Sequence, residues 1–185
     1  KKTLEEKVIA HCAPTLAGIK TANLFSYRYE SASVLDEELT AVSDKLKAKG
    51  VEMLVLKKNN SLALIYVYRR GKLGTDLKKP GVEELLTGYG YPGCRLDECI
   101  EQLKIRLAEC ENFPHEIGVF LSYPLCDVIG FIEQKGQNCK YYGLWKVYCN
   151  ENEAMKLFAK FKKCTDVYMQ VFANGRTITQ LTVAA

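Results

Sequence analysis

The sequence predicts a single α+β domain at residues 1–185, with a mixed, mainly antiparallel sheet of about five strands flanked by helices. Aromatic and β-branched segments alternate irregularly with segments of helical period. About half of the 185 residues are apolar and a quarter are charged, which is typical of a globular domain. A chain of this length can bury a continuous core without disulfides or metals.

The first element is a short helix capped by Thr3, with Glu6 three residues later completing a capping box. We expect this helix to end near Cys12, because Pro14 disfavours helical geometry in the residue before it. Pro14 then begins a second helical turn that runs to about Lys20. Cys12 would lie at the junction, close to the amide-rich start of the second piece.

Periodicity and turn residues define the next elements. Apolar residues follow Leu35 at helical spacing, and Gly50 occupies the place that usually ends a helix. Two apolar segments separated by KKNN predict a hairpin with Asn59 and Asn60 in its turn. The predicted elements are a strand at 22–29, a helix at 35–50, and strands at 51–56 and 61–68.

The second half of the chain alternates helices with shorter apolar segments. The predicted elements are helices at 82–86 and 96–110, a strand at 117–123, a helix at 125–136, a strand at 141–148, and an amphipathic helix from 154 towards 175. The period of 167–172 is ambiguous, so that this last segment fits either a helix or a strand.

Charge and hydropathy restrict the class of protein. The net charge of +4 is only mildly basic, which argues against a nucleic-acid partner, although basic residues near Tyr66 and Tyr68 leave that reading open. No apolar run is long enough to cross a bilayer, and the first residues do not resemble a signal peptide. We therefore expect a cytoplasmic protein without a membrane partner. Cofactor and oligomeric state are not predicted.

The cysteine count is high for a cytoplasmic chain. Without an export signal, and with a sufficient core, these residues are expected to be free thiols that pack as small hydrophobes. No pair has C-x₂-C spacing, so the sequence predicts no local zinc site. The eight cysteines are at positions 12, 94, 99, 110, 126, 139, 149 and 164.

Cys12 and His115 are the best candidates for catalysis. A thiolate is stabilised near helix N-terminal amides, and a histidine from elsewhere in the fold can act as its base. In this hypothesis Cys12 is the nucleophile and His115 the base, and Glu116 or a neighbouring polar group orients the imidazole, for hydrolysis or transfer of an acyl or amide group. The competing interpretation makes Cys12 a buried core residue and places His115 in a loop.

Two other readings use the same segments. His11, Cys12, His115 and Glu116 offer imidazole, thiolate and carboxylate ligands for a metal ion, although their spacing carries little information. Alternatively the protein is a non-catalytic binding or regulatory protein, whose pocket takes a small molecule or peptide. Lys20 and Arg69 would then anchor an anionic ligand.

Three blocks of the sequence resemble a bacterial family catalogued as domain of unknown function 3793. They are HCAPTLAGIKTANLF, FPHEIGVFLSYPLCDVIGFIEQKGQN and GLWKVY, and the likeness covers nearly the full chain. The resemblance implies that the blocks holding Cys12 and His115 are the recurring motifs, and it supplies no activity. The chain departs from the family pattern at Ser122, where glycine is usual, and at Cys126, where an acid is common. The second departure implies that Cys126 is not functional.

Overall fold

The computed structural model describes residues 2–93 and 95–185, so Cys94 and the packing role expected for it lie outside the described residues. The chain forms two compact units, Lys1–Lys72 with Lys163–Ala185, and Leu73–Lys162. A single domain over residues 1–185 remains a prediction.

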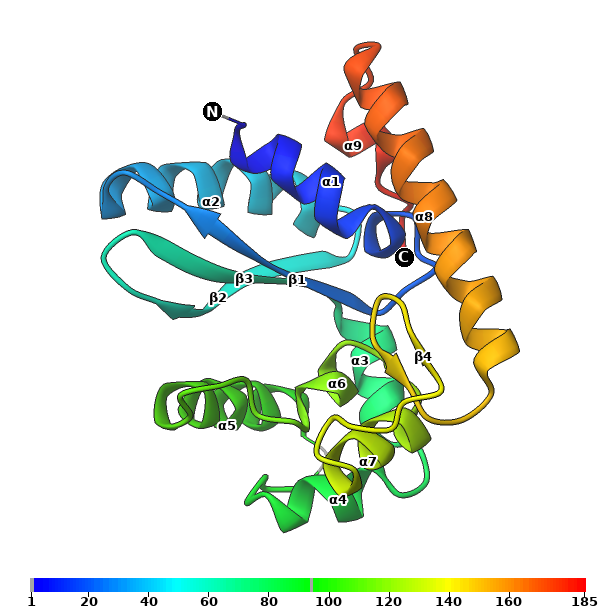
Figure 1. Cartoon of the computed structure of the whole chain (residues 1–185). Coiled ribbons are helices and arrows are strands. Elements are labelled where there is room, and N and C mark those ends of the chain that lie inside the picture. The colour runs from blue at the N-terminus through cyan, green and yellow to red at the C-terminus, as the bar shows by residue number, and fades with distance from the viewer. Residues whose placement is uncertain (1, 94) are drawn as a thin grey trace. The chain divides into compact units, whose positions relative to one another are not determined.

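The first unit is a three-stranded antiparallel sheet with helices packed on it. The strand order is β1-β3-β2, and α1 packs on β1 while α2 packs on β2, side by side on one face of the sheet (Figure 1). The elements are α1 (Leu4–Leu16), β1 (Ala22–Arg28), α2 (Ala32–Lys47), β2 (Val51–Lys58), β3 (Leu62–Arg69), the last part of α8 (Glu151–Ala173) and α9 (Ile178–Leu181).

Local signals in the sequence account for these elements. The Ser31 hydroxyl accepts a hydrogen bond from the backbone N–H of Val34 and caps α2. The carboxamide oxygen of Asn59 accepts the N–H groups of Ser61 and Leu62 in the predicted hairpin turn. The helices bury their apolar stripes against the sheet, and this core includes Val8, Ile9, Leu16, Leu35, Leu46, Ile65 and Val67.

The prediction for the first helix is wrong in one respect. α1 continues through Pro14 to Leu16, so Cys12 lies inside one helix and not at a junction. Inside a helix, a proline removes the hydrogen bond to the residue four positions earlier and crowds the carbonyl of that residue. Near the C-terminal end of a helix that loss affects a single turn, and the carbonyl of Pro14 accepts the N–H groups of Ile19 and Lys20 to close the helix.

The second unit is mainly helical. It contains α4 (Val82–Gly88), α5 (Leu96–Glu109), α6 (Ile117–Phe120), α7 (Leu125–Glu133), β4 (Tyr141–Tyr142), β5 (Lys146–Val147) and the first part of α8. The strands β4 and β5 form an antiparallel pair. An additional helix, α3 (Arg70–Leu77), spans the boundary between the units and was not predicted.

The predicted α+β class is confirmed, but the described strands form two antiparallel sheets, of three and two strands, so the expected single mixed sheet of about five strands is not confirmed. The strand predicted at residues 117–123 is wrong, because this segment contains the helix α6. A short run that is buried on all sides fits either structure, so its sequence pattern could not distinguish the two. Residues 141–148 form a hairpin, not one strand. At its tip a Cβ on Gly143 would lie 2.4 Å from the Phe158 ring, so only glycine allows this approach.

The ambiguous segment 167–172 belongs to the long helix α8. Within residues 2–93 and 95–185, no helix is both long and apolar enough to span a membrane.

Candidate functional site

Cys12 lies in the hydrophobic core of the first unit. Its side chain is fully buried on α1 among the apolar residues that face the sheet. Burial raises the pKa of the thiol far above its ordinary value, and the positive charge of Lys20 opposes this shift only in part. The thiol is therefore protonated at neutral pH and lacks the exposed, thiolate-favouring surroundings that are typical of a cysteine nucleophile.

Arg69 and Lys20 are both buried beside the end of α1. The guanidinium of Arg69 donates to the carbonyls of Thr15 and Leu16 at 2.7 and 2.8 Å, and to that of Val183 at 2.7 Å. These bonds satisfy carbonyls at the C-terminal end of the helix. Burial lowers the pKa of Lys20 to about 8, and the neighbouring Cys12 opposes this shift only in part.

His115 and Glu116 are adjacent, but their surroundings differ. His115 is exposed, and the Phe131 ring lies edge-on to it with 5.1 Å between the ring centroids. Glu116 is fully buried and accepts from Arg106 Nε at 2.7 Å and from the Tyr91 hydroxyl at 3.2 Å. The carboxylate of Glu116 thus completes an internal ion pair in the second unit. Cys12 belongs to the other unit, and its pairing with His115 remains a prediction.

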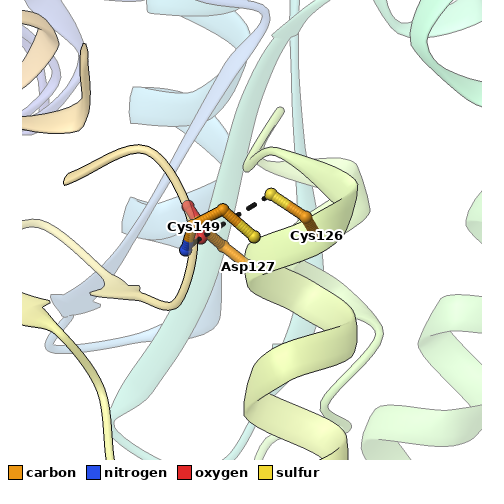
Figure 2. Close-up of side chains that lie close together, drawn as sticks. All are labelled: Cys126, Asp127 and Cys149. Carbon is orange, nitrogen blue, oxygen red and sulfur yellow. Dashed lines mark hydrogen bonds between the residues drawn. The ribbon is translucent and has the colours of Figure 1, made fainter. Parts of the chain in front are cut away.

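A cluster of two thiols and a carboxylate lies elsewhere in the second unit. Figure 2 shows Cys126 and Asp127 at the start of α7 and Cys149 on the neighbouring segment, with their side chains converging. One ligand atom from each residue lies within 4.8 Å of the other two. Among the described residues, no other group of three potential metal-ligating side chains is this close.

Asp127 holds the cluster together. Its Oδ1 accepts the backbone N–H groups of Tyr148 at 2.8 Å and Cys149 at 3.1 Å, and its Oδ2 accepts the indole N–H of Trp145 at 3.0 Å. The Cys126 thiol lies 3.9 Å from Oδ1. A buried carboxylate is costly unless it is hydrogen-bonded, and these three N–H donors stabilise it. The same bonds fix the segment that carries Cys149 to α7.

Both cysteines lie at the beginning of a helix. Cys126 is the second residue of α7, and Cys149 precedes Asn150, whose carbonyl accepts the first hydrogen bond of α8 from Ala154. A helix N-terminus stabilises anionic sulfur. In the absence of a metal ion, partial burial of the sulfur, a hydrogen bond with the Cys149 thiol and the Asp127 charge raise the pKa of Cys126 to about 12. Such a thiol is protonated at neutral pH, so binding of a metal ion would release its proton.

The backbone sets the spacing between α7 and the segment that carries Cys149. A Cβ on Gly130 would lie only 2.5 Å from the Cβ of Tyr148, so a side chain at this position would force the two segments apart. The cluster is thus held by a glycine contact and by the hydrogen bonds of Asp127.

The sequence analysis missed this cluster, and the family resemblance implied instead that Cys126 is not functional, whereas the structure places its thiol beside Asp127 and Cys149. Cys126 is exposed and Cys149 is half-buried, so the expectation that both pack as small hydrophobes is wrong for Cys126. The two cysteines are too far apart in the chain to form a recognisable ligand motif. One signal in the sequence could have indicated them, because both cysteines lie at the start of a helix. Cys126 follows Pro124 by two residues, and Cys149 directly precedes Asn150.

The fold and this cluster define an α+β protein with a paired-thiol site beside a buried carboxylate. The chain belongs to the family described as Protein of unknown function (DUF3793), whose profile matches residues 8–182, which confirms the resemblance seen in the sequence. No curated protein and no solved structure gives a significant match.

Proposed function

We propose that this protein binds a thiophilic transition-metal ion through Cys126 and Cys149, beside Asp127. The observation that carries the proposal is the convergence of two sulfurs and a carboxylate within 4.8 Å. Two sulfurs on one tetrahedral zinc lie about 3.8 Å apart, given a Zn–S distance of about 2.3 Å. Small side-chain rotations would therefore bring the thiols to a common ion.

The exposure of Cys126 supports binding that is reversible. Structural zinc sites are closed by four protein ligands, whereas this cluster has an exposed member and can exchange its ion with solvent. The non-catalytic alternative in the sequence analysis was a small-molecule or peptide pocket lined by the Cys12 and His115 blocks, so metal binding at Cys126 and Cys149 is a different proposal.

Titration with Co²⁺, followed by its thiolate charge-transfer absorption, tests this function. We expect one ion per chain in the reduced protein, and loss of the absorption in Cys126→Ser and Cys149→Ser. Cys110→Ser is the matched control, because Cys110 is half-buried at the end of α5 and outside the cluster. Unchanged absorption in both cluster variants would contradict the proposal.

A hydrolase or acyltransferase that uses Cys12, His115 and Glu116 is the second candidate. The feature in its favour is Lys20, whose charge lowers the pKa of Cys12 against the larger effect of burial. Its test is the turnover of a panel of activated acyl esters by the wild type, by Cys12→Ser and by His115→Ala. Cys99→Ser, also buried, is the control. Equal turnover by all four proteins would exclude it.

A further inference from the structure

We infer that the Cys126–Cys149 site takes a soft monovalent cation of the Cu⁺ class, bound by the two sulfurs alone, and that Asp127 is a positioning residue and not a ligand. This inference rests on the proposed function and specifies its ion. The reason is that the two carboxylate oxygens of Asp127 already accept three hydrogen bonds.

The carboxylate of Asp127 has little capacity left for a metal ion. A carboxylate offers about four lone-pair sites, and three of them are taken by the two backbone N–H groups and the indole N–H. Coordination through Oδ1 would compete with the hydrogen bonds that hold Cys149 in place. The bound ion would then weaken its own site.

The second oxygen is covered by a fixed aromatic group. Trp145, which donates to Oδ2, is buried and packs against Tyr123 and Phe158, each with 4.5 Å between ring centroids. The indole therefore cannot withdraw easily to expose Oδ2. The carboxylate orients the Cys149 segment in the way that outer-shell carboxylates orient metal ligands.

Two thiolates are the donors that remain. Among the described residues, the group of convergent metal-ligating side chains contains no imidazole and no third thiol. A two-sulfur set satisfies a soft monovalent ion, whereas Zn²⁺ would have to complete its tetrahedron with water.

The charge of a Cu⁺–dithiolate complex is tolerated at this site. Two thiolates and one Cu⁺ leave a net charge of −1, and the neighbouring carboxylate of Asp127 is stabilised by its own N–H donors. Both cysteines lie at a helix N-terminus, where each helix contributes roughly half a positive charge. The remaining negative charge is thus offset by the ends of α7 and α8.

The test is a pair of competition titrations on the full chain under anaerobic, reducing conditions. Cu⁺ is titrated against the chromophoric chelator bicinchoninate, and Zn²⁺ against a chromophoric zinc indicator. We expect one Cu⁺ per chain, bound at least a thousandfold more tightly than Zn²⁺. Cu⁺ uptake should be lost in Cys126→Ser and unchanged in Cys110→Ser.

Asp127→Asn separates a positioning role from a ligand role. We expect its Cu⁺ affinity to fall by about tenfold to a hundredfold, as for other outer-shell changes. X-ray absorption at the copper edge should show two sulfur scatterers and no oxygen in the wild type and in the variant. An oxygen scatterer in the wild type would overturn the inference.

Trp145→Phe keeps the test valid should Asp127→Asn fold poorly. It removes the N–H that occupies Oδ2 together with part of the indole ring, and because Oδ2 is then open to a metal ion we expect Zn²⁺ to bind this variant more tightly than it binds the wild type. Unchanged Zn²⁺ affinity in this variant, or tighter binding of Zn²⁺ than of Cu⁺ by the wild type, would overturn the inference and leave the proposed function standing. Failure of both ions to bind the wild type would reject the proposed function as well.

Discussion

Each unit of this protein buries a charged side chain that binds backbone groups, but the two charges differ in sign and in consequence. Arg69 donates to three carbonyls where α1 and the C-terminal segment meet. Asp127 accepts two backbone amides and an indole in the second unit. The segment bound by Arg69 carries Cys12, which is buried in the core, whereas the segment bound by Asp127 carries the half-buried Cys149, close to the exposed Cys126. In the first unit the buried charge stabilises the end of α1, and in the second unit it positions the segment that carries Cys149.

The largest expected effect concerns the thiol of the first unit. Iodoacetamide should label Cys12 in the native protein at least a thousandfold more slowly than in the unfolded chain, because the buried thiol reacts only after opening. Mass spectrometry of labelled peptides measures both rates, and labelling in denaturant is the control. Native labelling faster than that of a free thiol would restore Cys12 as a nucleophile and reverse the contrast between the units.

Arg69→Met should lower the free energy of unfolding by about 3–5 kcal/mol, because three carbonyls lose a charged donor. Urea unfolding followed by circular dichroism measures this. Arg28→Met, at an exposed position of β1, should change it by less than about 0.5 kcal/mol. Equal effects of the two substitutions would show that Arg69 does not support the first unit.

Asp127→Asn should lower the free energy of unfolding by about 2–3 kcal/mol, since an amide cannot accept hydrogen bonds from all three N–H donors. The same unfolding assay applies, with Glu133→Gln at the exposed end of α7 as control. Metal uptake distinguishes the two units. Asp127→Asn should weaken it, and Arg69→Met should leave it unchanged. Loss of uptake in Arg69→Met would remove the distinction.

The smallest effect is a pH dependence from Lys20. Burial lowers its pKa from 10.5 to about 8, so between these values the unfolded chain holds a proton that the folded chain lacks. Lys20 therefore contributes stability that increases as pH rises through about 8 and is lost as pH falls. The stability difference between wild type and Lys20→Met should grow by about 2 kcal/mol from pH 8 to 10.

The difference isolates Lys20, because the raised pKa values of Cys12 and Tyr27 act in the opposite direction in both proteins. Lys47→Met, at an exposed position of α2, should show no such growth. A constant difference between wild type and Lys20→Met would mean that the Lys20 amine stays protonated throughout this range.

Much of the first unit was predictable from the sequence, because its signals are local. The capping box of Thr3 and Glu6, the apolar stripe from Leu35 and the turn at Asn59 each act within a few residues. The second unit was harder to predict. Ile117–Phe120 is buried on all sides, and no period distinguishes helix from strand in such a short run.

The candidate site could not be predicted, because its members meet only through tertiary structure. Cys126 and Cys149 share no spacing motif, and Asp127 joins them through backbone N–H groups that leave no mark on the sequence. The neighbours His11 and Pro14 made Cys12 a candidate site residue in the sequence, but its side chain packs in the hydrophobic core of the first unit.

The close approach of Gly130 to Tyr148 has a consequence for tracing this site through related genomes. Because no side chain fits there, a relative that keeps the paired thiols at this spacing must keep the glycine as well. The pattern C-D-x₂-G followed by W-x₃-C therefore forms a compact fingerprint. Relatives that carry all of it should inherit metal binding, and those that have replaced the glycine should have lost the cysteines with it.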